Sequence, residues 1–409
     1  MATKLVTSLG KGRNAAKDAV QHAREKLGDV PVTLSFVYSS PVYEPREVVD
    51  TVRAETDNAH LIGASSAGEF TEREVERGSV VVGLLASDDI EVFTAIAEGV
   101  KQDPESAMLK VVSKLPRKVE NHPHLTVILT VDGLSGVGEE VTLLALYLLG
   151  KELKIVGGMA GDDFRMEKTF VFVDDNVCTD AVGVCLIASK MPLFTAVKHG
   201  HTPLSRALRA TRARGNVLYE INNQPAWEVW KKETAEAARR RGIEVKELKT
   251  AAEIAQFLTN YPLGLATEKE GEYKIRWPSG INEDGSLNFT CGIAEGAVFR
   301  VMDGSNLEAQ IKAMEEAALI ARHSAEEAGY HDFAGILIFD CAVRQLMLGD
   351  KFGESVARVK RVLPDVPILG WETYGEIRLE PGQFSGFHNT TSVVLLLPGV
   401  EKGDENEEE

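Results

Sequence analysis

Residues 61–69 read Leu-Ile-Gly-Ala-Ser-Ser-Ala-Gly-Glu, and residues 368–376 read Ile-Leu-Gly-Trp-Glu-Thr-Tyr-Gly-Glu. Each stretch has two aliphatic residues, a glycine, four further residues, a second glycine and a glutamate. A looser copy, Ile-Val-Gly-Gly-Met-Ala-Gly-Asp, occupies residues 155–162. A strand followed by a turn that ends in a carboxylate, repeated along the chain, indicates duplicated α/β units with equivalent loops. Equivalent loops are where we expect a shared ligand site.

The sequence around each copy repeats one order of predicted elements, which are defined by apolar residues at helical or strand spacing. The first stretch contains strands 4–8, 32–38, 61–64 and 79–86 and helices 14–27 and 45–55. The second contains strands 90–97, 125–131 and 154–157, helices 104–115 and 139–149, and a closing hairpin of 169–173 with 181–188. The third contains strands 297–302, 334–339, 367–369 and 391–397 and helices 306–328 and 353–362.

This alternation predicts an α/β fold with mixed β-sheets layered with helices, built from repeated β-α-β-α-β-β units. Strands such as 80–86 and 393–397 are continuous apolar runs, as expected where both faces of a sheet are covered. A four-layer helix–sheet–sheet–helix sandwich would bury these strands. Residues 202–296 interrupt the pattern, so we predict two domains, 1–200 and 201–398. The tail, 399–409, is acidic, and we expect it to be disordered.

Composition limits the classes of function. The 409 residues carry 45 Lys and Arg against 62 Asp and Glu, which argues against non-specific binding to nucleic acid or to an anionic membrane. The longest apolar run, 141–149, is far shorter than the roughly 20 residues that span a bilayer. The first residues do not form a signal peptide. We therefore expect a cytoplasmic protein without a nucleic-acid or membrane partner.

Motifs of enzymes and cofactor sites are incomplete in this chain. Residues 10–15 follow G-x-G-x-x-A, but the second strand lacks the acidic residue that a dinucleotide site needs. Two His-x-His pairs, at 122–124 and 199–201, have no third ligand beside them. The four cysteines show no C-x-x-C spacing. No Ser-His-Asp order with a nucleophile elbow is present, so we expect neither a resident metal nor catalysis.

Two interpretations of the Gly-Glu turns stay open. The glycines allow positive φ and a close approach to a ligand, and Glu69 and Glu376 could receive an ammonium group. Alternatively, each glutamate accepts hydrogen bonds within its own turn. Cys341 and Arg344 follow a buried strand, at the edge where α/β sheets bind ligands. We interpret Cys341 as a packed thiol, and Arg344 as either a contact for a ligand carboxylate or a surface salt bridge.

In their order and spacing, these motifs resemble paired FIST (F-box and intracellular signal transduction) domains over about residues 1–397. The segments that carry the resemblance are 61–69, 78–82, 156–162, 215–221 with Pro225-Ala226, Cys341-x-x-Arg344, 370–376 and 388–391. The resemblance implies a sensory domain pair that binds small molecules such as amino acids. Some members are haem proteins that sense nitric oxide. Because no signalling module follows residue 397, we expect a stand-alone protein that signals through a separate partner.

The leading hypothesis is therefore a sensor of a small zwitterion, whose amine meets an acidic residue and whose carboxylate meets Arg344. The predicted ligand-binding residues are Ser65, Ser66, Gly68, Glu69, Gly158, Gly161, Asp162, Cys341, Arg344, Glu372, Thr373, Gly375, Glu376, His388 and Asn389. We expect no cofactor. One alternative is non-covalent haem with His388 or His60 as axial ligand. Another is an enzyme whose site is assembled between the two halves. The oligomeric state stays open.

Overall fold

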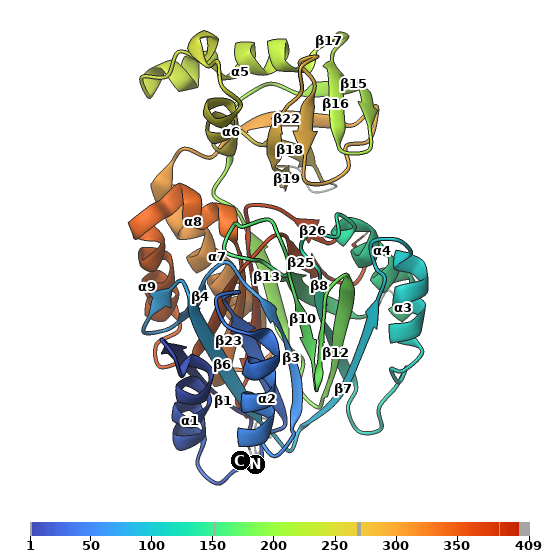
Figure 1. Ribbon diagram of the computed structural model, residues 1–409, viewed down its shortest axis with the longest axis vertical. Coiled ribbons are helices and arrows are strands. Elements are labelled where there is room, and N and C mark those ends of the chain that lie inside the picture. Colours follow the sequence, from blue (N-terminus) through green and yellow to red (C-terminus); the bar gives the residue numbers. More distant parts are fainter. Residues whose placement is uncertain (1, 151, 268–270, 384, 401–409) are drawn as a thin grey trace, which may run out of the picture.

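The computed structural model describes residues 2–150, 152–267, 271–383 and 385–400. Its body contains three units of one element order: strand, helix, strand, helix, strand, a short hairpin and a closing strand (Figure 1). The first unit contains β1 (Lys4–Lys11), α1 (Ala15–Leu27), β2 (Leu34–Ser39), α2 (Pro45–Glu55), β3 (His60–Ser65), the hairpin β4 (Glu69–Thr71) and β5 (Val75–Glu76), and β6 (Ser79–Ala86). Residues 401–409 of the predicted tail lie outside the described residues.

The second and third units repeat this order. The second contains β7 (Ile90–Glu98), α3 (Pro104–Val112), β8 (His124–Val131), α4 (Gly138–Leu149), β9 (Lys154–Met159), β10 (Val171–Val173), β11 (Asn176–Cys178) and β12 (Ala181–Ser189). The third contains β13 (Phe194–Lys198), α7 (Leu307–Glu327), β23 (Phe333–Cys341), α8 (Ala342–Leu348), α9 (Phe352–Val362), β24 (Ile368–Thr373), β25 (Glu376–Leu379), β26 (Phe387–His388) and β27 (Ser392–Pro398).

The three units exchange their hairpins in a cycle. Hairpin β4–β5 of the first unit extends the sheet of the third, β10–β11 of the second extends that of the first, and β25–β26 of the third extends that of the second. The strand orders are β1-β6-β2-β3-β10-β11, β26-β25-β9-β8-β12-β7 and β13-β27-β23-β24-β4-β5. Within each sheet one strand pair is parallel and its neighbours are antiparallel, so the sheets are mixed, as predicted. The body therefore has pseudo-threefold symmetry.

The inner faces of the three sheets share one hydrophobic core. Phe36, Val156 and Phe339 each come from a different sheet and belong to the same buried cluster. Helices cover the outer faces: α1 and α2 on the first sheet, α3 and α4 on the second, and α7 and α9 on the third (Figure 1). Through any two sheets the layers run helix, sheet, sheet, helix. The predicted α/β class with helix-covered mixed sheets is confirmed.

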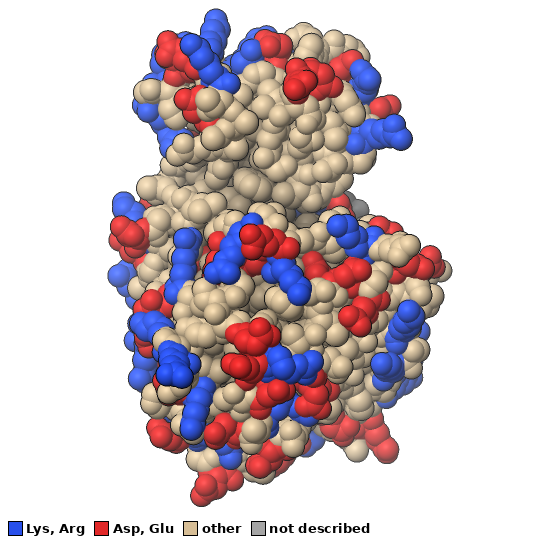
Figure 2. All heavy atoms as spheres, in the orientation of Figure 1, with Lys and Arg blue, Asp and Glu red and all other residues tan. Residues whose placement is uncertain are grey.

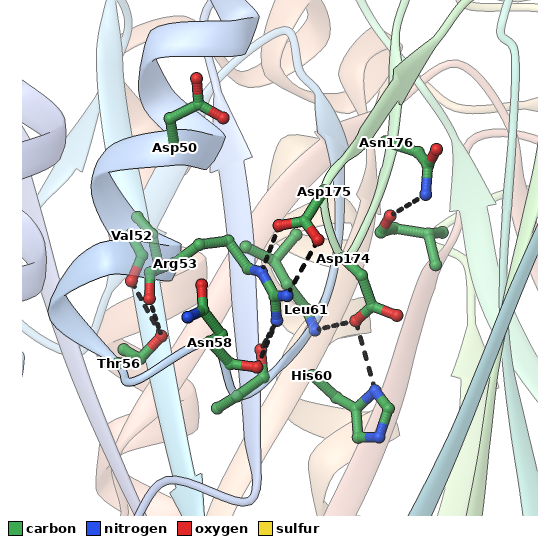
Figure 3. A network of polar contacts seen from close by, with 12 residues as sticks. Asp50, Val52, Arg53, Thr56, Asn58, His60, Leu61, Asp174, Asp175 and Asn176 are labelled. Atoms are coloured by element: carbon green, nitrogen blue, oxygen red, sulfur yellow. Dashed lines mark hydrogen bonds and ion pairs between the residues drawn. The ribbon is translucent and has the colours of Figure 1, made fainter.

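The exchanged hairpins are fixed by polar contacts as well as by strand pairing. Figure 3 shows the turn of β10–β11 against the first unit. The guanidinium of Arg53, on α2, donates to the carboxylate of Asp175 at 2.9 Å. The N–H of Leu61 donates to Asp174 at 3.0 Å, and the His60 ring lies 3.3 Å from the same carboxylate.

A cap, residues 202–303, is inserted into the third unit between β13 and α7. It stands above the body and is joined to it by two crossings of the chain (Figure 1). Its own core includes Trp230, Phe289 and Phe299. The cap contains β14 (Thr202–Pro203), β15 (Leu208–Arg214), β16 (Val217–Ile221), β17 (Gln224–Pro225), α5 (Ala226–Arg240), α6 (Ala251–Thr259), β18 (Leu263–Ala266), β19 (Tyr273–Arg276), β20 (Pro278–Ile281), β21 (Leu287–Phe289) and β22 (Val298–Asp303).

Two sequence-based predictions of strand pairing are wrong. The predicted strand 297–302 does not open the third unit, because the corresponding β22 pairs with β14, β15 and β18 inside the cap. The predicted hairpin of 169–173 with 181–188 is not formed, because β10 pairs with β11 and β12 lies between β7 and β8. Apolar spacing identifies a strand but not its neighbour, which tertiary packing selects. Among the described residues, every helix is too short or too polar to cross a membrane.

Candidate functional site

The turns that lead into the exchanged hairpins meet at one edge of the body. Each turn donates a backbone N–H to the last part of a strand in another unit. The three hydrogen bonds are Ala67 N to Glu372 O at 3.1 Å, Gly161 N to Ser65 O at 2.8 Å, and Tyr374 N to Met159 O at 3.0 Å. Ser65, Met159 and Glu372 therefore occupy equivalent positions, one at each junction between units. This edge is the C-terminal end of the parallel strand pairs, where ligands bind in many α/β folds.

The second glycine of the repeated motif makes room for the residue at this junction. A Cβ on Gly68 would lie 2.6 Å from the carboxyl carbon of Glu372. A Cβ on Gly375 would lie 3.3 Å from the sulfur of Met159 and would overlap the Phe387 ring. Neither glycine has positive φ. The expectation of positive φ is therefore wrong at these two turns, and the close approach is to a neighbouring side chain.

Glu69 and Glu376 close their own turns in the same way. Glu69 accepts from the Ser66 hydroxyl and from the N–H and hydroxyl of Ser79, at 3.2 and 2.5 Å. Glu376 accepts from the Thr373 hydroxyl at 2.9 Å and from the N–H and hydroxyl of Thr391 at 3.0 and 2.8 Å. Both side chains are fully buried, and burial raises the pKa of each to about 8. This geometry matches the turn-closing interpretation.

The carboxylate of Asp162, in the looser copy of the motif, is also engaged by hydrogen bonds from its own loop. Its carboxylate accepts the backbone N–H groups of residues 166, 167 and 168 at 2.7–3.0 Å and the hydroxyl of Tyr374 at 2.5 Å. Nearby, a Cβ on Gly158 would lie 2.6 Å from the methyl group of Thr373. A Cβ on Gly161 would lie 2.9 Å from the Ala67 nitrogen. These residues pack the three turns together.

Glu372 is the exception among the three junction residues. Its side chain is fully buried, and neither carboxyl oxygen has a hydrogen-bond partner within the described residues. At the other junctions, the Ser65 hydroxyl accepts the Phe170 N–H at 2.8 Å, and Met159 packs against Phe387 and Gly138. Burial raises the pKa of Glu372 well above its ordinary value, and the nearby Asp340 carboxylate raises it further. One junction in three thus presents an unsatisfied buried acid.

Asp340 and Arg344 form a buried ion pair beside Glu372. Asp340 is the register partner of Glu372 across the parallel strands β23 and β24. Arg344, on α8, donates from Nε to both Asp340 oxygens at 3.1 Å and from Nη1 to the backbone and side-chain oxygens of Gln310 at 2.9 and 3.2 Å. Both charged side chains are fully buried. Nη2 of Arg344 has no acceptor within the described residues.

Comparison with known proteins identifies the chain at this point. The family model of the FIST N domain matches residues 33–224, and that of the FIST C domain matches residues 227–378. This chain belongs to the FIST family. FIST domains are sensory domains of signal transduction. An uncharacterized protein of Methanocaldococcus jannaschii is 24% identical over 415 residues, which cover 94% of this chain and 77% of that protein.

Among solved structures, a crystal structure of chorismatase aligns with 97% of this FIST chain and 99% of its own, at 9% identity and a TM-score of 0.36. A likeness of that size carries no information about function.

The remaining predicted site residues of this FIST protein do not offer reactive or metal-binding groups. Cys341 is 4% exposed, and burial raises the pKa of its thiol well above the ordinary value, so it is not a thiolate nucleophile. The Nε2 atom of His388 lies 3.2 Å from the Arg378 carbonyl, and burial and Lys274 lower the pKa of the ring. His60 is 47% exposed and pairs with Asp174 (Figure 3). The haem alternative stays a prediction.

Asn389 belongs to the contact between the body and the FIST cap. Its side-chain oxygen accepts the Trp277 N–H at 3.3 Å, the Thr290 hydroxyl at 3.1 Å and the Cys291 thiol at 2.9 Å. Arg276 of the cap pairs with Glu139 of α4. Figure 2 shows that, on this face, the lower cap and the neck below it carry almost no charged side chains. The cap thus docks on the edge that contains the three junctions.

Three residues that bear on this site were absent from the sequence-based set. Asp340, Gln310 and His201 link Arg344 to the neck: the Gln310 amide lies 3.4 Å from Nδ1 of His201, whose Nε2 lies 2.8 Å from the Thr390 hydroxyl. Thr390 has φ of 52°, a strained value for a β-branched residue. An acid at the end of a buried strand, as in Asp340, was the one signal available. His201 belongs to a His-x-His pair, which the sequence presents only as a possible metal ligand, and Gln310 gives no signal in sequence.

Proposed function

We propose that this FIST protein is a cytoplasmic sensor that binds a small zwitterion, such as an amino acid, beside Glu372 and Arg344. The observation that supports the proposal is the buried carboxyl of Glu372, which has no partner within the described residues. A buried carboxyl without a partner costs several kcal/mol when ionised, so it is protonated unless a cation neutralises it. A ligand ammonium group supplies both hydrogen bonds and the opposite charge.

The charges around Glu372 favour a cationic group. Asp340, Glu69 and Asp163 each raise its pKa, whereas Arg77 lowers it. Asp163 has a carboxyl oxygen without a partner within the described residues, and its other oxygen accepts from Ser40 at 2.5 Å. Several acids gathered near one buried point attract an ammonium group and repel a free carboxylate.

Arg344 is the group that fits the ligand's carboxylate. Asp340 and Gln310 occupy Nε and Nη1 and hold the planar guanidinium in place, while Nη2 stays available. A fixed guanidinium edge suits a carboxylate oxygen. Asp340 is a neighbour of both groups: it pairs with Arg344 and is the register partner of Glu372.

The signal would leave through the cap. Arg344 contacts Gln310, whose amide also donates to the Gly304 carbonyl at 3.2 Å, where the chain returns from the cap. His201 lies where the chain enters the cap. A ligand that binds Arg344 would therefore affect both chain segments that join the cap to the body. A separate signalling partner would read the resulting cap position.

The decisive experiment measures proton release on binding. A thermal-shift screen of amino acids, amines and carboxylic acids first identifies a ligand, because binding raises the apparent stability. Titration calorimetry at pH 7 in two buffers of different ionisation enthalpy then counts protons. Because burial raises the pKa of Glu372 and favours its protonated form, an ammonium ligand should release up to one proton per site.

Matched variants assign the proton to Glu372. Glu372→Gln should lose the proton release and weaken binding at least tenfold. Glu376→Gln, which alters an equally buried carboxyl with all its hydrogen-bond partners, should keep both. Unchanged affinity in Glu372→Gln would overturn the proposed site. The absence of any shift across the amino acid panel would overturn the proposed ligand class.

A further inference from the structure

The outer face of α4 is apolar, unlike the equivalent helices of the other units. Residues 141–149 contain no charged side chain. Val141 and Ala145 pack on the second sheet, but Leu143 and Tyr147 on the opposite side are 42% and 83% exposed. Leu109 of the adjacent α3 adds a third exposed apolar side chain, at 49%. A helix that is apolar all round is normally buried on all sides.

The pseudo-threefold symmetry shows that the fold does not require this face. The equivalent α2 exposes Arg46, Glu47 and Asp50, and the equivalent α9 exposes Lys360 and Arg361. Those helices cover their sheets with an apolar inner face alone. The apolar outer face of α4 therefore serves something other than the fold of its own unit, and contiguous exposed apolar side chains mark interaction surfaces.

The charged residues around this face are separated by sign along the helix axes. Helices α3 and α4 run in the same direction, because β7, β8 and β9, which they connect, are mutually parallel. They pack side by side at one flank of the body (Figure 1). The N-terminal end of the pair exposes Asp103, Glu105 and Glu140 against Lys101, and the C-terminal end exposes Lys110, Lys114, Arg117 and Lys118 against Glu120 and Glu152. Arg117 donates to the Leu148 carbonyl at the end of α4 at 2.8 Å.

We propose that the α3–α4 face, centred on Leu109, Leu143 and Tyr147, binds a second copy of this chain in a twofold-symmetric dimer. A twofold axis that lies in the interface, perpendicular to the helix axes, lays the helix pairs antiparallel. The acidic end of one copy then meets the basic end of the other, and the apolar centres meet each other. An isologous interface needs this kind of self-complementary surface.

Sedimentation velocity on the full chain tests the proposal. The wild type should sediment at twice the 44.6 kDa chain mass. Tyr147→Asp should convert it to a monomer, because the substitution puts a charge in the apolar centre of the interface. The helix should stay folded, since Tyr147 is exposed. As a control, Ile320→Asp, at a 39% exposed position on α7, should leave the dimer intact. A wild type that stays monomeric up to about 100 µM would overturn the proposal, since interfaces of ordinary size associate below that concentration. So would a dimer that survives Tyr147→Asp.

Charge reversal tests the antiparallel arrangement. The variant Glu105→Lys/Glu140→Lys makes both ends of the face basic, and Lys114→Glu/Lys118→Glu makes both ends acidic. Each variant alone should dimerise at least tenfold more weakly than the wild type, and a mixture of the two should form a one-to-one dimer. Failure of the mixture to associate, with both variants folded by circular dichroism, would refute the arrangement.

Discussion

The two turn-closing carboxyls predict an unusual dependence of stability on pH. Burial raises the pKa of Glu69 and of Glu376 to about 8, from an ordinary value of 4.5. A carboxyl whose pKa is higher in the folded than in the unfolded protein binds more protons when folded. Its contribution to stability is complete below pH 4.5, decreases as the pH rises towards 8, and is constant above that. The folded protein should therefore lose stability through the neutral range.

The magnitude follows from linkage. Each carboxyl that is protonated in the folded chain and ionised in the unfolded chain changes the free energy of unfolding by about −1.4 kcal/mol per pH unit. From pH 4.5 to pH 7 one such group accounts for roughly 3 kcal/mol, and the two together for roughly twice that. Glu69→Gln or Glu376→Gln should reduce the slope by one proton, and the double variant by two.

Glutamine can replace the protonated acid without leaving an unsatisfied group. Its carbonyl oxygen accepts the N–H and hydroxyl of Ser79 or Thr391, and its amide donates to the hydroxyl of Ser66 or Thr373. The glutamine variants should therefore be as stable as the wild type near pH 5 and more stable near pH 8.

Guanidinium unfolding followed by circular dichroism at several pH values measures the slopes. The control is Glu105→Gln, an exposed glutamate on α3, which should leave the slope unchanged. Equal slopes in the wild type and in Glu69→Gln/Glu376→Gln, with equal denaturant m-values, would refute the reasoning, because the folded carboxyls would then be ionised at neutral pH.

Three further predictions concern the candidate site. Arg344→Met should destabilise the protein by about 3–5 kcal/mol, measured by denaturant unfolding, because Asp340 is left as an unpaired buried acid. Gly68→Ala should cost about 1–3 kcal/mol, because the new Cβ would lie 2.6 Å from the Glu372 carboxyl; in a Glu372→Ala background the cost should largely disappear, and equal costs in both backgrounds would contradict the contact. Glu372→Met, which copies Met159 of the second unit, should raise the melting temperature at pH 8 and abolish the ligand response, and a lowered melting temperature would show that the carboxyl supports the fold.

Local sequence patterns predicted most elements but not their partners. The helix at 45–55 and the strand at 79–86 are confirmed to the residue, because spacing, Pro45 and a continuous apolar run define them locally. The exchange of hairpins is invisible in sequence, since β4 continues the first unit along the chain yet joins the third sheet. The sequence pattern predicts the wrong first strand for the third unit, because the cap places about a hundred residues between β13 and α7.

The fifteen residues predicted from the sequence include two residues of the candidate site, and their binding of a ligand stays a prediction. The set of fifteen residues contains Glu372, which lies within the repeated motif, and Arg344, which follows the end of another buried strand. The sequence does not separate them from Glu69 and Glu376, since all four are charged residues that follow a predicted strand. The separation depends on which buried atoms have partners. The partner of Glu69 is Ser79 at the start of β6, and that of Glu376 is Thr391 just before β27. These hydrogen-bond partners are set by the tertiary structure and cannot be identified from the sequence.

The internal symmetry of the body provides a control that a single site would lack. Three positions with the same backbone contacts hold serine, methionine and glutamate, at Ser65, Met159 and Glu372. A hydrogen-bonded hydroxyl satisfies the first junction and an apolar side chain fills the second, so the fold itself has two solutions without a carboxyl. A buried acid at the third junction destabilises the protein relative to either solution. A residue that lowers stability, when equivalent positions hold residues that do not, is expected where function requires it.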